Sequence, residues 1–417
     1  MRIAVVSPFV DRRHGTERAL AECLERFAQQ PNVEIHLYSQ RVEDLRGVGL
    51  SSQGPSGTRI MWHAVPAIPG PHLVKYLWWF IANHAQRFWD SRFRGLRFDL
   101  LYSPGVNTFG ADAISVHVVF GEFYRRVRPR LRLRGTALSR WPVIMHRRLY
   151  YRLICFLEGL IYTRKGTALT AISQHSADCL KELYGRDDVR VIRYGVDTAV
   201  FSPNARKARR DSERSSMEMD AGEFCLLLIG NDWKNKGLSA LLSAVAECEK
   251  LPLKLLVAGS DDRREYYEAV QKLGVDAKVK FLEPSADVMK FYGAADAYVG
   301  PSLEDAYGLP ILEAMACGLP VIASARAGAS EILRDGENGF ILQNPEDSRE
   351  LAALLRKLCS EPDLCIHLGE EAARTAAVQS WAQHADDTWD FLRQLWRKRA
   401  RHDEMPEPNE NDDSRAG

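Results

Sequence analysis

The chain has 417 residues, 46% of them hydrophobic, and a formal net charge of +1 at pH 7. This length is sufficient for two domains of ordinary size with substantial cores. The balanced charge gives no bulk field that would favour nucleic acid, so we expect no nucleic-acid partner. The eight cysteines form no CxxC pair and lie in apolar or helical surroundings. That pattern is typical of buried thiols in a reducing compartment and argues against a zinc site.

Neither a signal peptide nor a membrane span is expected. The first ten residues, MRIAVVSPFV, are too short for a signal peptide and favour a buried strand. The most apolar stretch, residues 73–82, contains Lys75 and is shorter than the roughly 18–20 residues that a spanning helix needs. We therefore expect a cytoplasmic protein, either soluble or at the inner face of the cell membrane.

The first half of the chain alternates strands and helices. Residues 2–7 predict a strand, the following loop contains Gly15, and residues 17–29 have helical periodicity. Further strands are predicted at residues 33–39, 99–103, 114–117, 168–172 and 189–192. This order predicts an α/β fold with a parallel, doubly wound sheet, whose ligand lies beyond the strand C-termini near residues 9–15.

Residues 202–222 are polar and charged and predict an interdomain linker or a long surface loop. After them the pattern restarts, with strands at 224–230, 253–259, 279–282, 297–299 and 320–323, separated by helices. We therefore expect two Rossmann-like domains, 1–200 and 201–380, that face each other across a cleft. Residues 381–400 predict a last helix that packs back on the first domain, and the acidic tail 403–417 is expected to be disordered.

Residues 301–318, PSLEDAYGLPILEAMACG, carry the strongest functional pattern. Gly308 allows close approach of a ligand to the backbone, Pro310 suits the first helical position, and Gly318 ends the helix. The amides and the positive dipole end of that helix favour an anion. Because Asp305 and Glu313 bracket the loop, the segment suits a sugar nucleotide, with amides on the diphosphate and carboxylates on hydroxyls.

The second half resembles the nucleotide-binding half of the family-4 retaining glycosyltransferases, which have the two-domain GT-B fold. The resemblance covers most of residues 189–381 through ordered pieces that include IGNDWKNKGLSALLSA, LLVAGS, VKFLEP, the segment around residues 301–318, and DGENGFIL. The first half is similar more loosely, through HGTERALAECL, ADAISVH and ALTAISQHS. The resemblance implies that the N-terminal domain binds the acceptor and the C-terminal domain binds the nucleotide sugar.

In that family two acidic residues, eight positions apart, hold the donor. The resemblance implies that Glu313 binds the ribose hydroxyls and that the first acid contacts the donor sugar. Here the first position is Asp305, which is one methylene shorter than the family's Glu. Glu304 is the alternative for that role. Tyr307, Gly308 and Leu309 form the loop that approaches the phosphates.

The resemblance also implies an Arg and a Lys that neutralise the diphosphate. Lys236 stands at the Lys position, whereas Asn231 replaces the Arg. Lys234 and Arg193 are the candidates for the second phosphate. Since no DxD metal site occurs in the folded region, we expect a UDP- or GDP-linked donor without a metal cofactor.

In the N-terminal half, His117 closes ADAISVH and would reach the donor sugar or the leaving phosphate. Gly15 and Glu17 correspond to the first loop near the phosphates and the acceptor, and Glu331 would orient the glycine loop 328–331. The resemblance implies transfer with retention, in which the acceptor attacks from the leaving-group face. Lys236, Asp305 and His117 are the predicted catalytic residues.

The acceptor is expected to be a glycan or a lipid-linked glycan, in cell-envelope or exopolysaccharide synthesis. Residues 122–152 interleave Arg with Leu, Tyr and Trp, and residues 76–80 are aromatic, so contact with an anionic membrane is a further prediction. An ordinary solvated helix face is the alternative. For the whole chain, the alternatives are a GT-B epimerase and a nucleotide-sugar-binding pseudoenzyme. The Asn231 and Asp305 departures are the only support for the pseudoenzyme.

Overall fold

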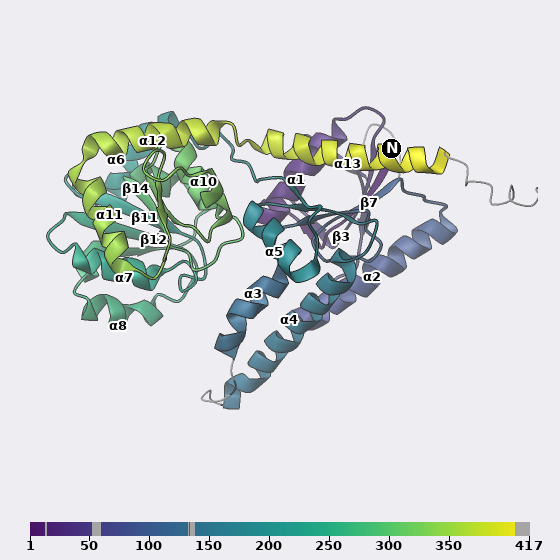
Figure 1. Ribbon diagram of the computed structural model, residues 1–417, viewed down its shortest axis with the longest axis horizontal. Helices are drawn as coiled ribbons and strands as arrows, with labels where there is room; N and C mark the ends of the chain where they lie inside the picture. Colours follow the sequence, from purple (N-terminus) through teal and green to yellow (C-terminus); the bar gives the residue numbers. More distant parts are fainter. Residues whose placement is uncertain (13–14, 52–59, 132, 134–137, 405–417) are drawn as a thin grey trace, which may run out of the picture. The chain divides into compact units, whose positions relative to one another are not determined.

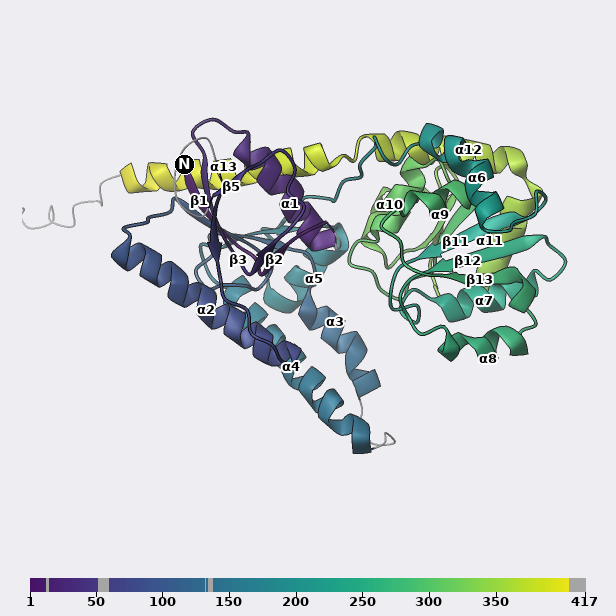
Figure 2. The same cartoon turned by 180° about the vertical axis from the view of Figure 1, so that it is seen from behind.

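The computed structural model describes residues 1–12, 15–51, 60–131, 133 and 138–404. The chain forms two compact units, each built around one main parallel sheet. The first comprises Met1–Thr170, Glu182–Arg190 and the C-terminal segment from Ala385, and the second comprises Ala171–Lys181 and Val191–His384. Figures 1 and 2 show helices on both faces of each sheet, so the predicted α/β class is confirmed.

The sheet of the first unit has eight strands in the order β10-β9-β8-β7-β1-β3-β6-β5. The pairs β1–β3, β1–β7, β3–β6 and β7–β8 are parallel. The strands are β1 (Arg2–Val6), β3 (Glu34–Ser39), β5 (Leu50–Ser51), β6 (Ile60–Ala64), β7 (Leu100–Pro104), β8 (Ala113–Val116), β9 (Ala168–Ala171) and β10 (Arg190–Val191), with a separate pair β2 (Phe9–Val10) and β4 (Arg41–Val42).

The helices around this sheet are α1 (Gly15–Ala28), α2 (His72–Phe93), α3 (Phe120–Val127) and α4 (Trp141–Tyr162), whereas most of α5 (Gln174–Tyr184) belongs to the second unit. Short 3₁₀ turns at Arg128–Leu131 and Leu138–Arg140 precede α4. The central strands β1, β3, β7, β8 and β9 are largely buried, as expected for a parallel sheet that is covered by helices on both faces. Among the helices that the structure describes, none is long and apolar enough to cross a membrane.

The second unit contains a six-stranded sheet in the order β13-β12-β11-β14-β15-β16, parallel throughout. Its strands are β11 (Phe224–Ile229), β12 (Leu253–Ala258), β13 (Val279–Leu282), β14 (Ala297–Gly300), β15 (Val321–Ser324) and β16 (Phe340–Leu342). Its helices are α6 (Pro203–Ser216), α7 (Leu238–Glu247), α8 (Arg264–Lys272), α9 (Met289–Ala294), α10 (Leu309–Ala316), α11 (Ser348–Ser360) and α12 (Pro362–Ala377). Each strand predicted for this half lies within two residues of an observed one.

The predicted linker is largely wrong, because residues 203–216 form helix α6. Ser202 caps this helix by accepting a hydrogen bond from the Ala205 amide (3.3 Å), and Pro203 occupies its first turn. Two arginines of α6 then bind one carboxylate: Arg210 lies 2.5 Å and Arg214 3.0 Å from Asp296. Ion pairs therefore hold a helix that has almost no apolar face of its own.

The last helix, α13 (Trp381–Glu404), is continuous with the second unit at its start and packs in the first unit beyond Ala385. Ala385, Trp389 and Leu392 join the core of the first unit, and the Trp389 ring lies 5.4 Å from Phe27. The first two residues of the predicted tail, 403 and 404, are helical. The rest of that prediction, residues 405–417, lies outside the described residues.

Candidate functional site

The turn before α10 has the geometry that its sequence predicts. Gly308 has φ 89°, a conformation that residues with a Cβ rarely adopt, and a Cβ there would lie 3.0 Å from Ile311 and 3.3 Å from Asp305. Pro310 has no amide hydrogen, and the Ile311 amide donates to the Gly308 carbonyl (2.9 Å). Any phosphate contact from this helix end would therefore use the amides of Gly308 and Leu309.

Lys236 and Asp305 form an ion pair between the lysine Nζ and the carboxylate Oδ2. Only 15% of the Lys236 side chain and 16% of the Asp305 side chain are exposed. Gly230, with φ 137°, lies beside the lysine stem, since a Cβ there would be 2.9 Å from Lys236 Cε. The structure thus brings two predicted catalytic residues together from the loops that follow β11 and β14.

These two loops pack closely at Gly237, which precedes α7. A Cβ on Gly237 would lie 1.9 Å from the Pro301 carbonyl oxygen, and its φ is 77°. Asn235 adds two hydrogen bonds across the same contact. Its side-chain amide donates to the Glu304 carbonyl (2.6 Å), and its carbonyl accepts from the Leu303 amide (2.7 Å). The position of Lys236 relative to Asp305 is therefore set by backbone packing.

Glu304, the alternative first acid, has a histidine partner that the sequence analysis did not identify. Its Oε1 lies 3.2 Å from Nε2 of His175, the second residue of α5. The Cys179 thiol, 3.8 Å from the same ring nitrogen, and the Glu304 carboxylate raise the pKa of His175 to about 10. His175 lies in ALTAISQHS, but nothing in its spacing predicts which carboxylate it meets.

Glu313, the predicted ribose ligand, is 9% exposed on α10. Its Oε2 accepts a hydrogen bond (2.8 Å) from the hydroxyl of Tyr292, a fully buried residue of α9. Burial and the neighbouring Glu313 carboxylate raise the pKa of Tyr292 well above its usual range, so this hydroxyl remains a donor. Tyr292 therefore fixes the orientation of the Glu313 side chain.

Glu331 binds the first turn of α5. Its two carboxylate oxygens accept hydrogen bonds from the amides of Gln174 (2.9 Å) and His175 (2.8 Å), where the helix dipole favours negative charge. Arg193 lies 3.3 Å from the same carboxylate. Glu331 thus joins the glycine loop to α5. It also forms an ion pair with Arg193, a candidate phosphate ligand.

The two remaining donor-site candidates are held by neighbours. Tyr307 is buried, and its hydroxyl donates to the Tyr194 carbonyl (3.0 Å). The exposed Asn231 accepts hydrogen bonds at Oδ1 from the Ser260 amide and hydroxyl, both at 2.9 Å. Tyr307 therefore anchors the loop before α10 to Tyr194. Asn231 joins the loops that follow β11 and β12.

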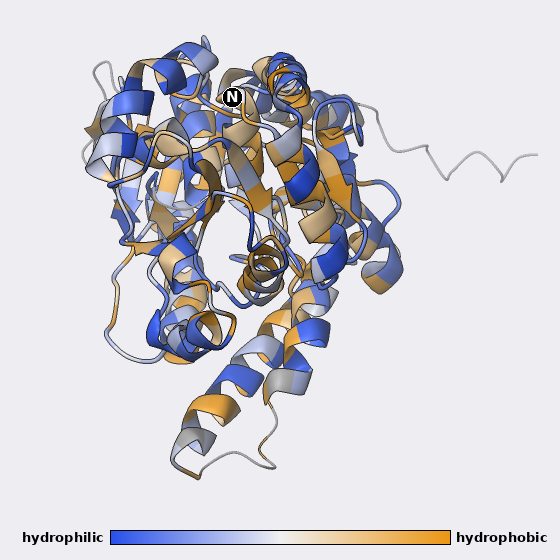
Figure 3. Ribbon diagram, turned by 90° about the vertical axis from the view of Figure 1, so that its left-hand side faces the viewer, coloured by the Kyte–Doolittle hydropathy of each residue, from blue (hydrophilic) through white to orange (hydrophobic). Residues whose placement is uncertain are grey.

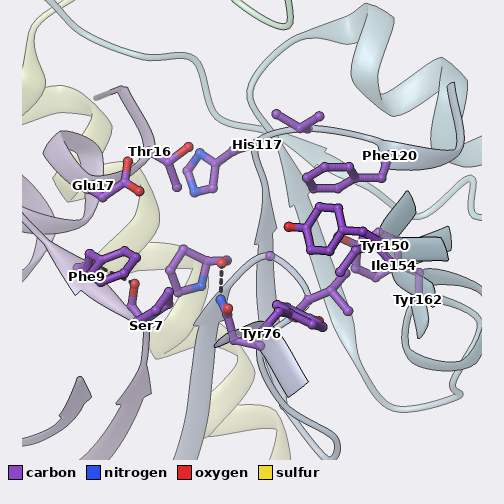
Figure 4. Close-up of a pocket in the computed structure, with 16 residues that line it drawn as sticks. Ser7, Phe9, Thr16, Glu17, Tyr76, His117, Phe120, Tyr150, Ile154 and Tyr162 are labelled. Carbon is purple, nitrogen blue, oxygen red and sulfur yellow. Dashed lines mark hydrogen bonds between the residues drawn. The ribbon is translucent and has the colours of Figure 1, made fainter. Parts of the chain in front are cut away.

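The first unit contains a cavity of about 290 Å³ at the carboxyl ends of β1, β7 and β8 (Figure 4). Thr16, Glu17 and His117 lie at one end of it, and Phe120, Tyr150, Ile154 and Tyr162 lie at the other. His117 directly follows β8 and is 6% exposed, and Gly15 begins α1 immediately before Thr16. Aromatic rings beside a carboxylate and an imidazole suit a ligand with both an apolar face and hydroxyl groups.

Tyr76 and Tyr150 were not identified from the sequence as lining residues, because they lie on helices far apart in the chain. Their rings are 6.0 Å apart, and the Tyr76 hydroxyl donates to the Val106 carbonyl (2.5 Å). Glu158, also on α4, has no exposed surface and accepts hydrogen bonds from the amides of Phe120 and Gly121. Burial raises the pKa of Glu158 to about 7.

The comparison with protein families matches residues 209–375 to the family described as glycosyl transferases group 1. Curated relatives include a D-inositol 3-phosphate glycosyltransferase of Rhodococcus erythropolis, which is 34% identical over 232 residues, or 52% of this chain and 51% of the relative. Its counterpart in Mycobacterium bovis is 31% identical over 240 residues, or 55% of this chain and 47% of the relative. The chain thus spans about half the length of the curated relatives it matches.

Solved structures are similar over almost the whole chain. WaaG, a glycosyltransferase involved in lipopolysaccharide biosynthesis, has a TM-score of 0.72 at 19% identity and covers 93% of this chain and 99% of its own. Anabaena Alr3699/HepE in complex with UDP-glucose has a TM-score of 0.67 at 19% identity, with 94% and 100% covered. At these identities the likeness shows the fold alone, which is GT-B. Residues 209–375, which span most of the second unit, are thus similar to the glycosyl transferases group 1 family, and the whole chain shares the GT-B fold of the solved structures.

Proposed function

We propose that this protein is a retaining glycosyltransferase that moves a sugar from a UDP- or GDP-linked donor to a glycan or lipid-linked glycan. The observation that carries the proposal is the shielded Lys236–Asp305 ion pair beside the Gly308 turn. A diphosphate at this turn would compete with Asp305 for the lysine. The released carboxylate could then accept hydrogen bonds from hydroxyls of the donor sugar.

The remaining site groups fit this division of work. Glu313, which lies on α10 and is oriented by Tyr292, would bind the ribose hydroxyls. The Gly308 and Leu309 amides, the α10 dipole and Lys236 would stabilise the charge that develops on the leaving diphosphate. With such groups held in position, no protein nucleophile and no metal are needed. The acceptor hydroxyl attacks from the leaving-group face as the bond between the sugar and the diphosphate breaks, and its proton passes to the departing phosphate oxygen.

The acceptor is assigned to the cavity of the first unit. Its Glu17 and His117 offer partners for hydroxyl groups, and its tyrosines offer flat faces for the apolar side of a sugar ring. We place the reaction in the cytoplasm, at the inner face of the cell membrane and in the synthesis of an envelope or secreted polysaccharide. A carbohydrate acceptor that is attached to lipid suits such a pathway.

A screen of UDP-, GDP- and ADP-sugars for thermal stabilisation tests the donor assignment, because a ligand that binds only the native state raises the melting temperature. We expect at least one UDP- or GDP-sugar to raise it, and expect the shift to shrink in Lys236→Ala. Proton NMR of the product should then show the donor's anomeric configuration. An inverted product, or equal shifts in both proteins, would contradict the proposal.

A second candidate is a nucleotide-sugar-binding protein without transferase activity. It is favoured by Asn231, which replaces the expected Arg and is engaged by Ser260. Donor hydrolysis separates the two candidates. An active transferase should release free sugar slowly from its donor in the absence of acceptor, whereas a pseudoenzyme would bind the donor and release none.

A further inference from the structure

More than half of the large apolar side chains that are exposed in the described residues lie on just two helices, α2 and α4. On α2 they are Val74, Leu77, Trp78, Ile81, Phe88, Trp89 and Phe93, and on α4 they are Trp141, Val143, Met145, Leu149, Phe156 and Leu160. Phe88 is 69% exposed, Phe93 62% and Phe156 63%. Single exposed apolar residues are normal on a protein surface, but a group of them on two helices indicates an interaction surface.

On each helix these side chains form a stripe. Along α2 they recur at steps of three and four residues and lie opposite the buried face formed by Trp79, Asn83 and Asp90. Along α4, the series Trp141, Met145, Leu149, Phe156 and Leu160 has the same spacing and lies opposite the buried Ile154, Leu157 and Glu158. Each helix therefore packs one face on its own unit and leaves an apolar stripe exposed on the opposite face.

The two helices that carry the stripes are neighbours. The Leu73 amide of α2 donates to Nε2 of His146 of α4 (3.4 Å), and the Tyr76 and Tyr150 rings are 6.0 Å apart. Figures 1 and 2 show both helices side by side in one layer below the sheet of the first unit. Along the α3–α4 hairpin, at the bottom of Figure 3, apolar and polar segments alternate.

The charges on these helices are sorted by sign. Their only acidic residues are Asp90 and Glu158, which are 1% and 0% exposed. Asp90 is engaged inside the unit by Tyr38, His63 and Arg94. The exposed charged residues of both helices are all basic, namely Lys75, Arg92, Arg147 and Arg152. The surface is thus apolar and positive although the chain as a whole is almost neutral.

We propose that α2 and α4 dock together onto an anionic lipid bilayer, lying in its interfacial plane. Aromatic and aliphatic side chains would enter the boundary between head groups and acyl chains, and the arginines would contact anionic head groups. A second copy of this chain is disfavoured as the occupant, because pairing two such faces would bring like charges together. An anionic bilayer complements both properties of the surface.

The docking has a consequence for the substrate, and that consequence rests on the proposed function. Tyr76 and Tyr150 belong to α2 and α4 and also line the cavity assigned to the acceptor. A protein docked through these helices would hold that cavity close to the membrane. The acceptor would then be a glycan anchored in the same bilayer.

Sedimentation with vesicles tests the docking without donor or acceptor, so its failure is distinct from failure of the transfer reaction. The vesicles contain equal amounts of phosphatidylglycerol and phosphatidylcholine, and pure phosphatidylcholine serves as the neutral comparison. We expect binding to the anionic vesicles that weakens as salt rises from about 0.05 M to about 0.5 M. No sedimentation at low salt, or equal binding to both vesicles, would overturn the inference.

Variants locate the surface. Phe88→Ser with Trp89→Ser should lower binding about tenfold or more, because two large side chains lose their burial in the membrane. Arg92→Gln with Arg152→Gln should flatten the salt dependence. Ile366→Ser with Val378→Ser, two exposed apolar residues of the second unit, is the matched control and should bind like the wild type. Equal losses in the control and aromatic variants would contradict the assignment.

A second measurement does not depend on how well these variants fold. Brominated lipids should quench part of the wild-type tryptophan fluorescence on anionic vesicles, and Trp89→Phe should remove a measurable share of that quenching. Sedimentation velocity tests the rival occupant. A wild-type dimer that becomes a monomer in the aromatic variant, without any vesicle binding, would assign the surface to self-association and overturn the proposal.

Discussion

Lys236 and Asp305 are 69 residues apart in the sequence, yet their side chains form an ion pair at the carboxyl edge of one sheet. The pair is about 85% shielded on each side, so it is a stronger interaction than an exposed surface pair. The ion pair brings together two residues that the sequence assigned to different parts of the donor, Lys236 to the diphosphate and Asp305 to the sugar. Under the proposed function, the donor diphosphate would replace Asp305 as the partner of Lys236.

Replacing the lysine should therefore impair the reaction more than the fold. We predict that Lys236→Ala lowers kcat/KM by about tenfold to a thousandfold, the range typical of losing one group that stabilises transition-state charge. Lys272→Ala, an exposed lysine of α8 in the same unit, is the matched control and should change kcat/KM less than threefold, or by about 0.6 kcal/mol. Steady-state kinetics with the donor identified by the thermal-shift screen measures kcat/KM for both variants. A wild-type rate in Lys236→Ala would remove this residue from the mechanism.

The Glu331 carboxylate predicts a stability effect in the second unit. Glu331→Gln removes the charge that faces the first turn of α5 and Arg193, and should cost about 1–3 kcal/mol of unfolding free energy. Urea denaturation measures the change. Glu337→Gln is the control, since its pair with Arg334 is exposed and should contribute about 0.5 kcal/mol or less. Equal effects of the two substitutions would contradict the capping role of Glu331.

The sequence predicted the second sheet closely because its buried strands are continuous apolar runs separated by amphipathic helices. It failed at α6, whose stability comes from Arg210 and Arg214 reaching Asp296, a partner more than eighty residues away. Local propensity contains no information about that partner. The Gly308 turn is local and was predictable, whereas the contacts of Glu304 with His175 and of Glu313 with Tyr292 depend on tertiary packing.

The cavity of the first unit illustrates the same limit. His117 and Glu17 follow strand ends and could be identified, because parallel strands present their carboxyl ends at one edge. Tyr76 and Tyr150 come from helices whose relative position no local pattern records. The sequence associated both segments with a membrane surface, whereas the structure also places Tyr76 and Tyr150 in the lining of the cavity.

That lining predicts an effect on the acceptor and none on the donor. Tyr150→Ala should lower the rate of transfer about tenfold at limiting acceptor, because a stacking face is lost, while hydrolysis of the donor alone stays unchanged. Tyr150→Phe retains the ring and should stay within about threefold of the wild type. Parallel assays of transfer and hydrolysis separate these outcomes. An equal fall in hydrolysis would show that Tyr150 acts on the donor or on the fold.

Glu158 predicts a dependence of stability on pH in the first unit. Burial raises its pKa from 4.5 to about 7, so the folded state holds this proton more tightly than the unfolded state does. The resulting stabilisation is complete below pH 4.5 and is lost as pH rises through 7, a change of about 3 kcal/mol. The difference in unfolding free energy between wild type and Glu158→Gln should therefore shift against the wild type across that interval. The two proteins share every other titrating group, so the comparison isolates Glu158. A constant difference from pH 4.5 to pH 8 would contradict the prediction. It would show that Glu158 is already ionised at low pH, stabilised by hydrogen bonds from the Tyr184 hydroxyl and the amides of Phe120 and Gly121.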